Sequence, residues 1–135
     1  MGARGTGSFD NDDAGDWAVE LEEAEGTGAI TAAFDAVLEV GDDFLELPDA
    51  GVGIAAADVV AALLGRPSPD LPPEVAAWVA GKPPPEAGLV KKAQKVVRRV
   101  LEDSELKELW SESAGADQWR QGVEELLRRL DAAGD

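Results

Sequence analysis

The chain has 135 residues, 28 of them acidic and 12 basic, and its formal net charge of -16 disfavours direct binding to nucleic acid or to anionic membranes. This is the length of one ordinary domain. Because the sequence contains no His, Cys or Tyr, it excludes Ser-His-Asp and Cys-His catalysis, disulfides and zinc–thiolate sites.

Residues 1–11 form a glycine-rich segment that leads into a predicted acidic helical hairpin over 12–40. Asp10 is the expected N-cap of the first helix, where its carboxylate accepts a hydrogen bond from a free backbone N–H. Phe9 precedes it and is placed to contact Ala14 across the first turn. Apolar residues recur at helical spacing in both helices, namely Ala14, Trp17, Leu21 and Ala24 in the first and Ile30, Phe34, Val37 and Leu38 in the second. The short loop between the helices predicts an antiparallel pair.

The stretch 52–64, VGIAAADVVAALL, carries a single charge, at Asp58, and has apolar side chains on every side of the helix that it predicts. Exposure of any side would leave apolar residues in water, so we expect this helix to be central and buried. It is too short to span a bilayer, which takes about 20 apolar residues. Pro48, Gly51 and Gly53 are expected to delay its start.

Four further helices are predicted over 73–132, beginning at Pro72 and Pro73, which suit a helix start. Ser104 is the expected N-cap of the third of these helices, and Asp117 is the expected N-cap of the fourth. Their inward-facing apolar residues recur at helical spacing and comprise Val75, Trp78, Val79, Leu89, Ala93, Val96, Val97, Val100, Leu101, Leu106, Leu109, Trp110, Trp119, Val123, Leu126, Leu127 and Leu130.

Helical periodicity runs along the whole chain, and Val, Ile and Thr are too sparse to favour a sheet. The sequence therefore predicts an all-α fold, a compact single-domain bundle over 1–135 with about seven helices around the buried central helix 52–64. One core suffices at this length, so the whole chain is assigned to one domain.

The N-terminal segment carries a distinctive motif. It reads Gly-x-x-Gly-x-Gly-x-Phe-Asp-Asn-Asp, followed by an Asp-Trp pair and by Ala-Ala-Leu-Leu-Gly-Arg-Pro at 61–67. The residues that define the motif are Gly2, Gly5, Gly7, Phe9, Asp10, Asn11, Asp12 and Trp17. These features resemble a family of small bacterial proteins known as the domain of unknown function 4259 family. The resemblance covers nearly the whole chain and implies no activity, cofactor or catalytic residue; members usually have Trp where this chain has Arg4.

The glycines of this motif admit sharp bends or close contact between backbone segments, so we expect the motif to dock the N-terminus structurally. A phosphate-binding loop is disfavoured, because no P-loop lysine follows and Asp10, Asp12 and Asp13 would repel a phosphate.

Acidic residues are concentrated at the start of the chain, where residues 1–50 contain fourteen acidic side chains and one basic side chain, Arg4. Pairs at 20–23 and 39–42 resemble the motifs of all-α nucleotide pyrophosphohydrolases. About 15 Å of helix rise separates the two pairs, which is too far for one magnesium ion. Four other carboxylates come level across the predicted hairpin and are candidate calcium or magnesium ligands: Asp12, Asp16, Asp35 and Glu39. A solvated, mutually repelling face is the interpretation that we favour.

Asp58 is a lone carboxylate in an apolar helix, which costs several kcal/mol unless the carboxylate is paired. Its expected partners are Arg4, a Trp indole N–H or backbone amides of the N-terminal segment, which predicts a structural acid rather than a catalytic one. The five cations at 91–99 lack interleaved aromatic residues. We therefore expect them to pair with the acidic hairpin or with the acids at 102–105, and not with nucleic acid.

The leading functional hypothesis is a small, non-enzymatic cytoplasmic protein whose acidic N-terminal hairpin binds a basic protein partner, as an inhibitor or immunity protein does. Cytoplasmic residence is the default because residues 1–9 carry no apolar signal-peptide core. We expect a monomer or a weak homo-oligomer that uses no cofactor. Two alternatives stay open: a carboxylate-based divalent-metal enzyme acting on nucleotides, and an acidic protein that mimics duplex DNA.

Overall fold

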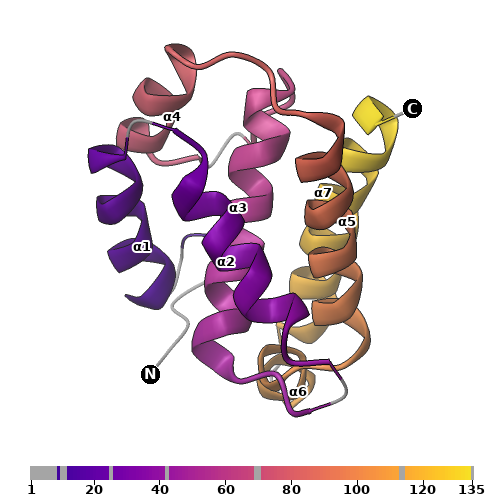
Figure 1. Ribbon diagram of the computed structural model, residues 1–135. Coiled ribbons are helices and arrows are strands. Elements are labelled where there is room, and N and C mark those ends of the chain that lie inside the picture. Colours follow the sequence, from indigo (N-terminus) through magenta and orange to yellow (C-terminus); the bar gives the residue numbers. More distant parts are fainter. Residues whose placement is uncertain are drawn as a thin grey trace.

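The computed structural model describes residues 9, 12–24, 26–41, 43–68, 71–112 and 115–134 (Figure 1). Over these residues the chain forms seven helices and no strand, with the bounds α1 Asp12–Glu23, α2 Gly28–Leu38, α3 Leu47–Leu63, α4 Pro73–Ala80, α5 Ala87–Glu102, α6 Glu105–Ser111 and α7 Ala116–Gly134. The predicted all-α fold is confirmed. None of the described helices combines the length and the apolar character needed to cross a membrane.

Helix α3 lies at the centre of the bundle and contacts each of the other six helices. Figure 1 shows α1 and α4 on one side of α3 and α5 and α7 on the other. Every residue from Gly53 to Ala62 is buried, which confirms the predicted central helix. Alanine fills many of these positions, and its small side chain lets neighbouring helices approach from all sides.

The start of α3 differs from the prediction. The helix begins at Leu47 rather than at 52, with Pro48 in its first turn and with Gly51 and Gly53 inside it. Pro48 starts the helix instead of delaying it, because a first-turn residue needs no backbone N–H for an intrahelical hydrogen bond. The two glycines are buried, so the packing around them outweighs their low helix propensity.

Gly53 shows what that packing requires. A Cβ atom at this position would lie 2.9 Å from Cγ2 of Val37 in α2 and 3.0 Å from Cγ1 of Val96 in α5. Both valines are fully buried and β-branched, so they have little freedom to move aside. The absence of a side chain at Gly53 therefore lets α2, α3 and α5 meet at one point.

We predict that Gly53→Ala lowers the free energy of unfolding by roughly 1 kcal/mol, because overpacking that costs about 1–3 kcal/mol exceeds a propensity gain of about 1 kcal/mol. Gly122→Ala is the matched control, since Gly122 is exposed in α7 with open space around its position. This control is expected to raise the free energy of unfolding by about 0.5–1 kcal/mol. Urea denaturation followed by circular dichroism measures both variants, and equal gains would contradict the packing role of Gly53.

Helices α1 and α2 run in opposite directions, as expected for the predicted hairpin (Figure 1). Trp17 and Leu21 of α1 and Ile30 and Phe34 of α2 are buried. Both helices pack mainly against α3 rather than against each other, and α1 also contacts α4 while α2 also contacts α5. The two helices of the hairpin are therefore held mainly by α3 and make few contacts with each other.

The N-terminal motif is only partly described. Phe9 is half-buried and packs against the hydrophobic core, and Trp17 is buried within that core. The other motif residues, apart from the backbone of Asp12 at the start of α1, lie outside the described residues: Gly2, Gly5, Gly7, Asp10 and Asn11.

The last two helices bear out one predicted cap and correct another. Ser104 caps α6 as expected, because its hydroxyl accepts a hydrogen bond from the backbone N–H of Lys107 at 3.0 Å. Asp117 lies inside the first turn of α7 instead of capping it, since the helix already begins at Ala116. Leu109, predicted to face inward, is 42% exposed.

The exposure of Leu109 follows from how α6 is held. The backbone N–H of Glu105 donates to the carbonyl of Leu45 at 2.9 Å, and the Glu105 carboxylate accepts from the backbone N–H of Leu47 at 2.6 Å. These bonds fix the first turn of α6, where Leu106 is buried, and they leave Leu109 in the second turn at the surface.

Candidate protein-interaction site

The exposed surface of α1 carries only one sign of charge. Asp16, Glu20, Glu22 and Glu23 are exposed on it, and Asp13 is half-buried. The sequence contains no Lys, Arg or His between Arg4 and Arg66, so α1, α2 and α3 bring no cation of their own to this surface.

A groove of about 250 Å³ runs between α1, α2 and the start of α3. Its carboxylates are Asp13, Asp16 and Glu20 from α1 and Asp49 from α3, and we call these four residues the acidic face. Its apolar lining comprises Trp17, Ala33, Ala36, Pro48 and Val52. Within the described part of the chain, none of the four carboxylates forms an ion pair or a hydrogen bond through its side chain. Their negative potential is therefore not cancelled by a neighbouring cation.

Three of the four predicted metal candidates, Asp16, Asp35 and Glu39, have described side chains. Asp35 forms an ion pair with Lys92, with 2.9 Å between the carboxylate and the ammonium group, while Asp16 lies in the acidic groove and Glu39 follows the end of α2. The side chain of Asp12 lies outside the described residues. Among the described side chains, no three acidic residues come close enough together to hold one metal ion, and this includes the acidic face.

Of the five cations at 91–99, Lys92 forms the expected ion pair with the acidic hairpin, at Asp35, whereas Arg98 pairs with Asp131 of α7. Arg99 donates hydrogen bonds to the carbonyl oxygens of Gly41 and Asp43 after α2. These cations of α5 therefore bind α2 and the turn after it, and α5 makes no contact with α1 over the described residues.

Asp58 is buried in α3 and pairs with Arg129 of α7, with 3.2 Å between the carboxylate oxygen and the guanidinium. Arg129 also donates to the carbonyl of Arg66 at 2.9 Å and to the carboxylate of Glu125 at 2.8 Å. The expected partner Arg4 lies outside the described residues. The sequence offered one signal for Arg129: it directly precedes the buried Leu130, at the edge of the apolar stripe of α7.

We predict that Asp58→Asn lowers the free energy of unfolding by about 3 kcal/mol, because it removes the buried carboxylate partner of Arg129 and leaves the mostly buried guanidinium with only the half-exposed carboxylate of Glu125. Arg98→Gln is the control, since Arg98 pairs with Asp131 at the surface and such exposed pairs contribute about 1 kcal/mol or less. Chemical denaturation measures both variants. An Asp58→Asn variant as stable as the parent protein would show that the pair is not structural.

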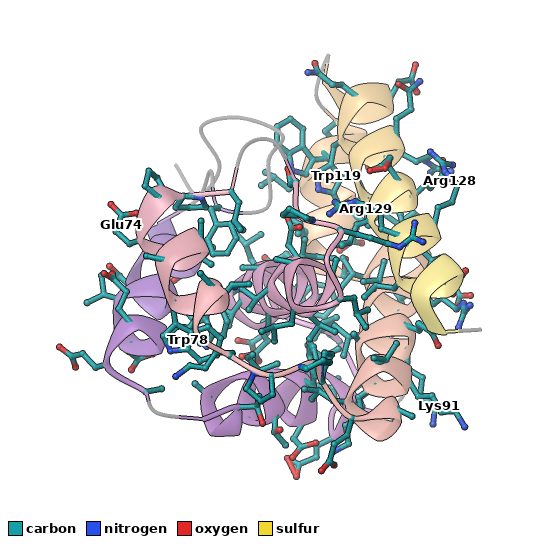
Figure 2. The ribbon with its side chains drawn as sticks, turned by 90° about the horizontal axis from the view of Figure 1, so that it is seen from above. Glu74, Trp78, Lys91, Trp119, Arg128 and Arg129 are labelled. Carbon is teal, nitrogen blue, oxygen red and sulfur yellow. The ribbon has the colours of Figure 1, made fainter. Side chains whose placement is uncertain are left out.

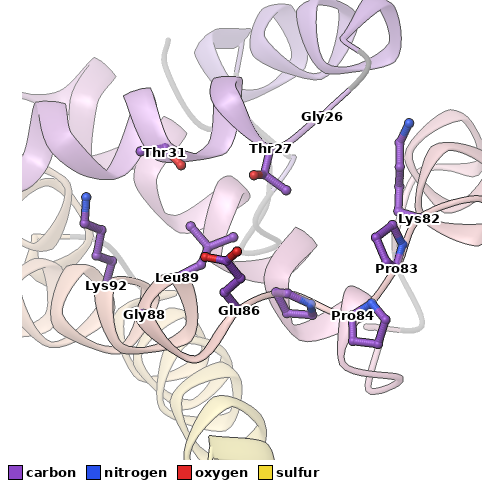
Figure 3. Close-up of a pocket in the computed structure, with 11 residues that line it drawn as sticks. Gly26, Thr27, Thr31, Lys82, Pro83, Pro84, Glu86, Gly88, Leu89 and Lys92 are labelled. Carbon is purple, nitrogen blue, oxygen red and sulfur yellow. The ribbon is translucent and has the colours of Figure 1, made fainter.

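A second hollow, of about 590 Å³, lies where α2 and α5 begin (Figure 3). Lys92 and Lys82 line its two ends, and Glu86 lies between them. The indole N–H of Trp78 donates to the carbonyl of Ala24 at 2.9 Å, and the Lys82 ammonium lies 4.8 Å from the Trp78 ring centroid, so α4 is anchored to the end of α1 beside this hollow. Because both signs of charge line the hollow, its electrostatics select neither an anion nor a cation.

The fold and this surface together define an acidic all-α domain with a carboxylate-lined groove between α1, α2 and α3. Residues 2–122 match the family described as Domain of unknown function (DUF4259), and the chain belongs to this family, as the N-terminal motif predicted. No curated protein and no solved structure matches the chain.

Proposed function

We propose that the protein is a non-enzymatic cytoplasmic interaction protein that binds a basic protein partner through the acidic face. An inhibitor or immunity protein, which covers a basic working surface of its target, is the concrete form of this function. The observation that supports the proposal is the groove lined by four carboxylates and by apolar side chains, in which the carboxylates have no cation partner among the described residues.

The groove suits the side chain of a partner's Lys or Arg. The aliphatic stem of such a side chain can pack against the apolar lining, which includes Pro48 and Val52, while its charged head remains among the carboxylates. Val19, which does not line the groove, is also 56% exposed on the same helix. A basic, amphipathic surface is therefore the partner chemistry that fits.

The unpaired state of the acidic face favours rapid association. A cationic partner displaces no ion pair of the described residues when it binds the acidic face, so little intramolecular energy is lost. A patch of one sign also raises association rates by about 10–10³-fold at low salt, and this effect weakens as the salt concentration rises.

The spread of the carboxylates favours several partner cations over a single metal ion. The described members of the acidic face form no group that could hold one ion. They lie on two different helices, α1 and α3, which suits contacts with several Lys or Arg side chains. Neither the metal-enzyme interpretation nor the DNA-mimic interpretation gains a supporting observation of its own from the described residues.

We predict that Asp16→Asn combined with Glu20→Gln weakens binding of the basic partner by about tenfold or more, because two charge contacts are removed. The measurement is affinity capture from a lysate of the native cell at low and at high salt, with quantitative mass spectrometry. The dissociation constant of each captured protein is then measured with the purified components.

Asp117→Asn combined with Glu124→Gln is the matched control, since it neutralises one Asp and one Glu that are exposed on α7. It should leave capture nearly unchanged. Equal capture by both double variants would exclude the acidic face as the binding surface, and capture that does not weaken at high salt would contradict electrostatic recognition.

A further inference from the structure

A second charged surface lies on α5 and α7, and we call it the basic edge. Lys91 and Lys95 of α5 and Arg128 of α7 are exposed, and none of them has a side-chain partner within the described residues. Arg98 of α5 is exposed beside them and pairs with Asp131 of α7. The described part of the molecule therefore carries unpaired cations as well as unpaired carboxylates.

The two charged surfaces face away from each other. α3 contacts both α1 and the α5–α7 pair, whereas α1 contacts neither α5 nor α7 over the described residues. Figure 2 shows Lys91 and Arg128 on the outer side of the molecule, opposite the side occupied by α1. A single copy cannot bring its own basic edge onto its own acidic face.

The charges on the two helices have matching spacing. Asp13, Asp16 and Glu20 follow one another at intervals of three and four residues along α1. Lys91, Lys95 and Arg98 do so at intervals of four and three along α5. Each set spans about 10 Å of helix, because an α-helix rises about 1.5 Å per residue.

From this complementarity we propose that the acidic face of one copy docks the basic edge of a second copy. The inference rests on the acidic face of the proposed function and adds a second surface that the proposed function does not use. A second copy would then cover the acidic face until a basic partner displaces it.

The net charge of -16 opposes self-association, but its effect depends on salt. At about 0.15 M salt the Debye length is about 8 Å. A domain of this size is roughly 35 Å across, so charges on the far sides of two docked copies are screened from each other. The charges that meet at the contact remain within the Debye length. Association is therefore expected to be strongest at intermediate salt, weaker at low salt and absent at high salt.

The geometry also determines the form of the assembly. In a two-fold symmetric dimer each copy presents the same patch, which requires the acidic face and the basic edge to lie on the same side. Because they lie on opposite sides, the contact is head-to-tail, and each docked copy exposes a further free surface. The parent protein should therefore form short chains of copies rather than closed dimers.

The test is sedimentation velocity of the purified protein over a range of concentrations at about 20, 150 and 500 mM salt, which correspond to long, intermediate and short Debye lengths. The parent protein should show an average mass that rises with concentration, most strongly at the intermediate salt. Two double variants, D16N/E20Q and K91Q/K95Q, should each remain monomeric. An equimolar mixture of the two should form a one-to-one complex that grows no further, since it retains one intact acidic face and one intact basic edge.

R66Q/R120Q is the matched control for K91Q/K95Q, because it removes two exposed cations outside the basic edge. It should associate as the parent protein does. A parent protein that is monomeric at every salt concentration, or a K91Q/K95Q variant that associates like the parent, would overturn the inference.

The experiment separates this inference from the proposed function. K91Q/K95Q leaves the acidic face intact, so it should capture the basic partner normally. Normal capture by a parent protein that never self-associates would leave the proposed function standing and remove only the inference. Capture unaffected by D16N/E20Q would remove the proposed function.

Discussion

The structure depends on pairing one buried carboxylate. Asp58 lies in the helix that every other helix contacts, and α3 itself carries no cation to neutralise it. Arg129 brings the counter-charge from α7 and simultaneously binds the carbonyl of Arg66 beyond the end of α3. This pair therefore fixes both the rotation of α3 and the position of α7, because an unpaired charge in that place would cost several kcal/mol. Gln94 of α5 then donates to the carbonyl of Leu130, which ties α5 to the same helix.

The same distribution of cations creates the acidic face. All positive charges of the described helices lie after α3, and the ones that reach inward are used by the fold. Arg129 neutralises the core carboxylate, Lys92 neutralises Asp35, and Arg99 binds carbonyl oxygens after α2. Among the described residues, no cation pairs with a carboxylate of the acidic face, and α1 makes no contact with the cation-bearing helices α5 and α7. The groove is thus a consequence of the core arrangement rather than of local sequence alone.

The sequence predicted the local features of this fold well. Apolar spacing marked each helix and nearly every buried residue, and Ser104 was recognisable as a cap from its position alone. The predicted start of α3 was wrong because the low helix propensity of Gly51 and Gly53 indicated a later start. In the structure, Gly53 lies inside the helix and lets three helices pack together. Whether packing outweighs helix propensity at a residue depends on neighbours that are distant in the sequence, here Val37 and Val96.

The acidic character of the candidate site was predictable from the sequence, but the set of residues that form it was not. The excess of carboxylates at the start of the chain identified the acidic hairpin, but Asp49 comes from α3, and its meeting with Asp13 and Asp16 depends on how α1 crosses that helix. The same tertiary arrangement directs Asp35 to Lys92 and away from Asp16. Arg129 was missed for a similar reason, since its pairing joins residues that lie 71 positions apart.

The separation of charge links the two binding modes proposed for this protein. One acidic face can hold either the basic edge of a second copy or a basic protein partner, so the two modes exclude each other. The second copy also carries the excess negative charge of the whole chain, whereas a basic partner is attracted by both the groove and that net charge. A basic partner is therefore favoured over a second copy at equal concentration, and self-association matters only when the partner is scarce. Any acidic domain whose inward-facing cations are all engaged by its core should show the same ordering, because its outer carboxylates are left without an intramolecular counter-charge.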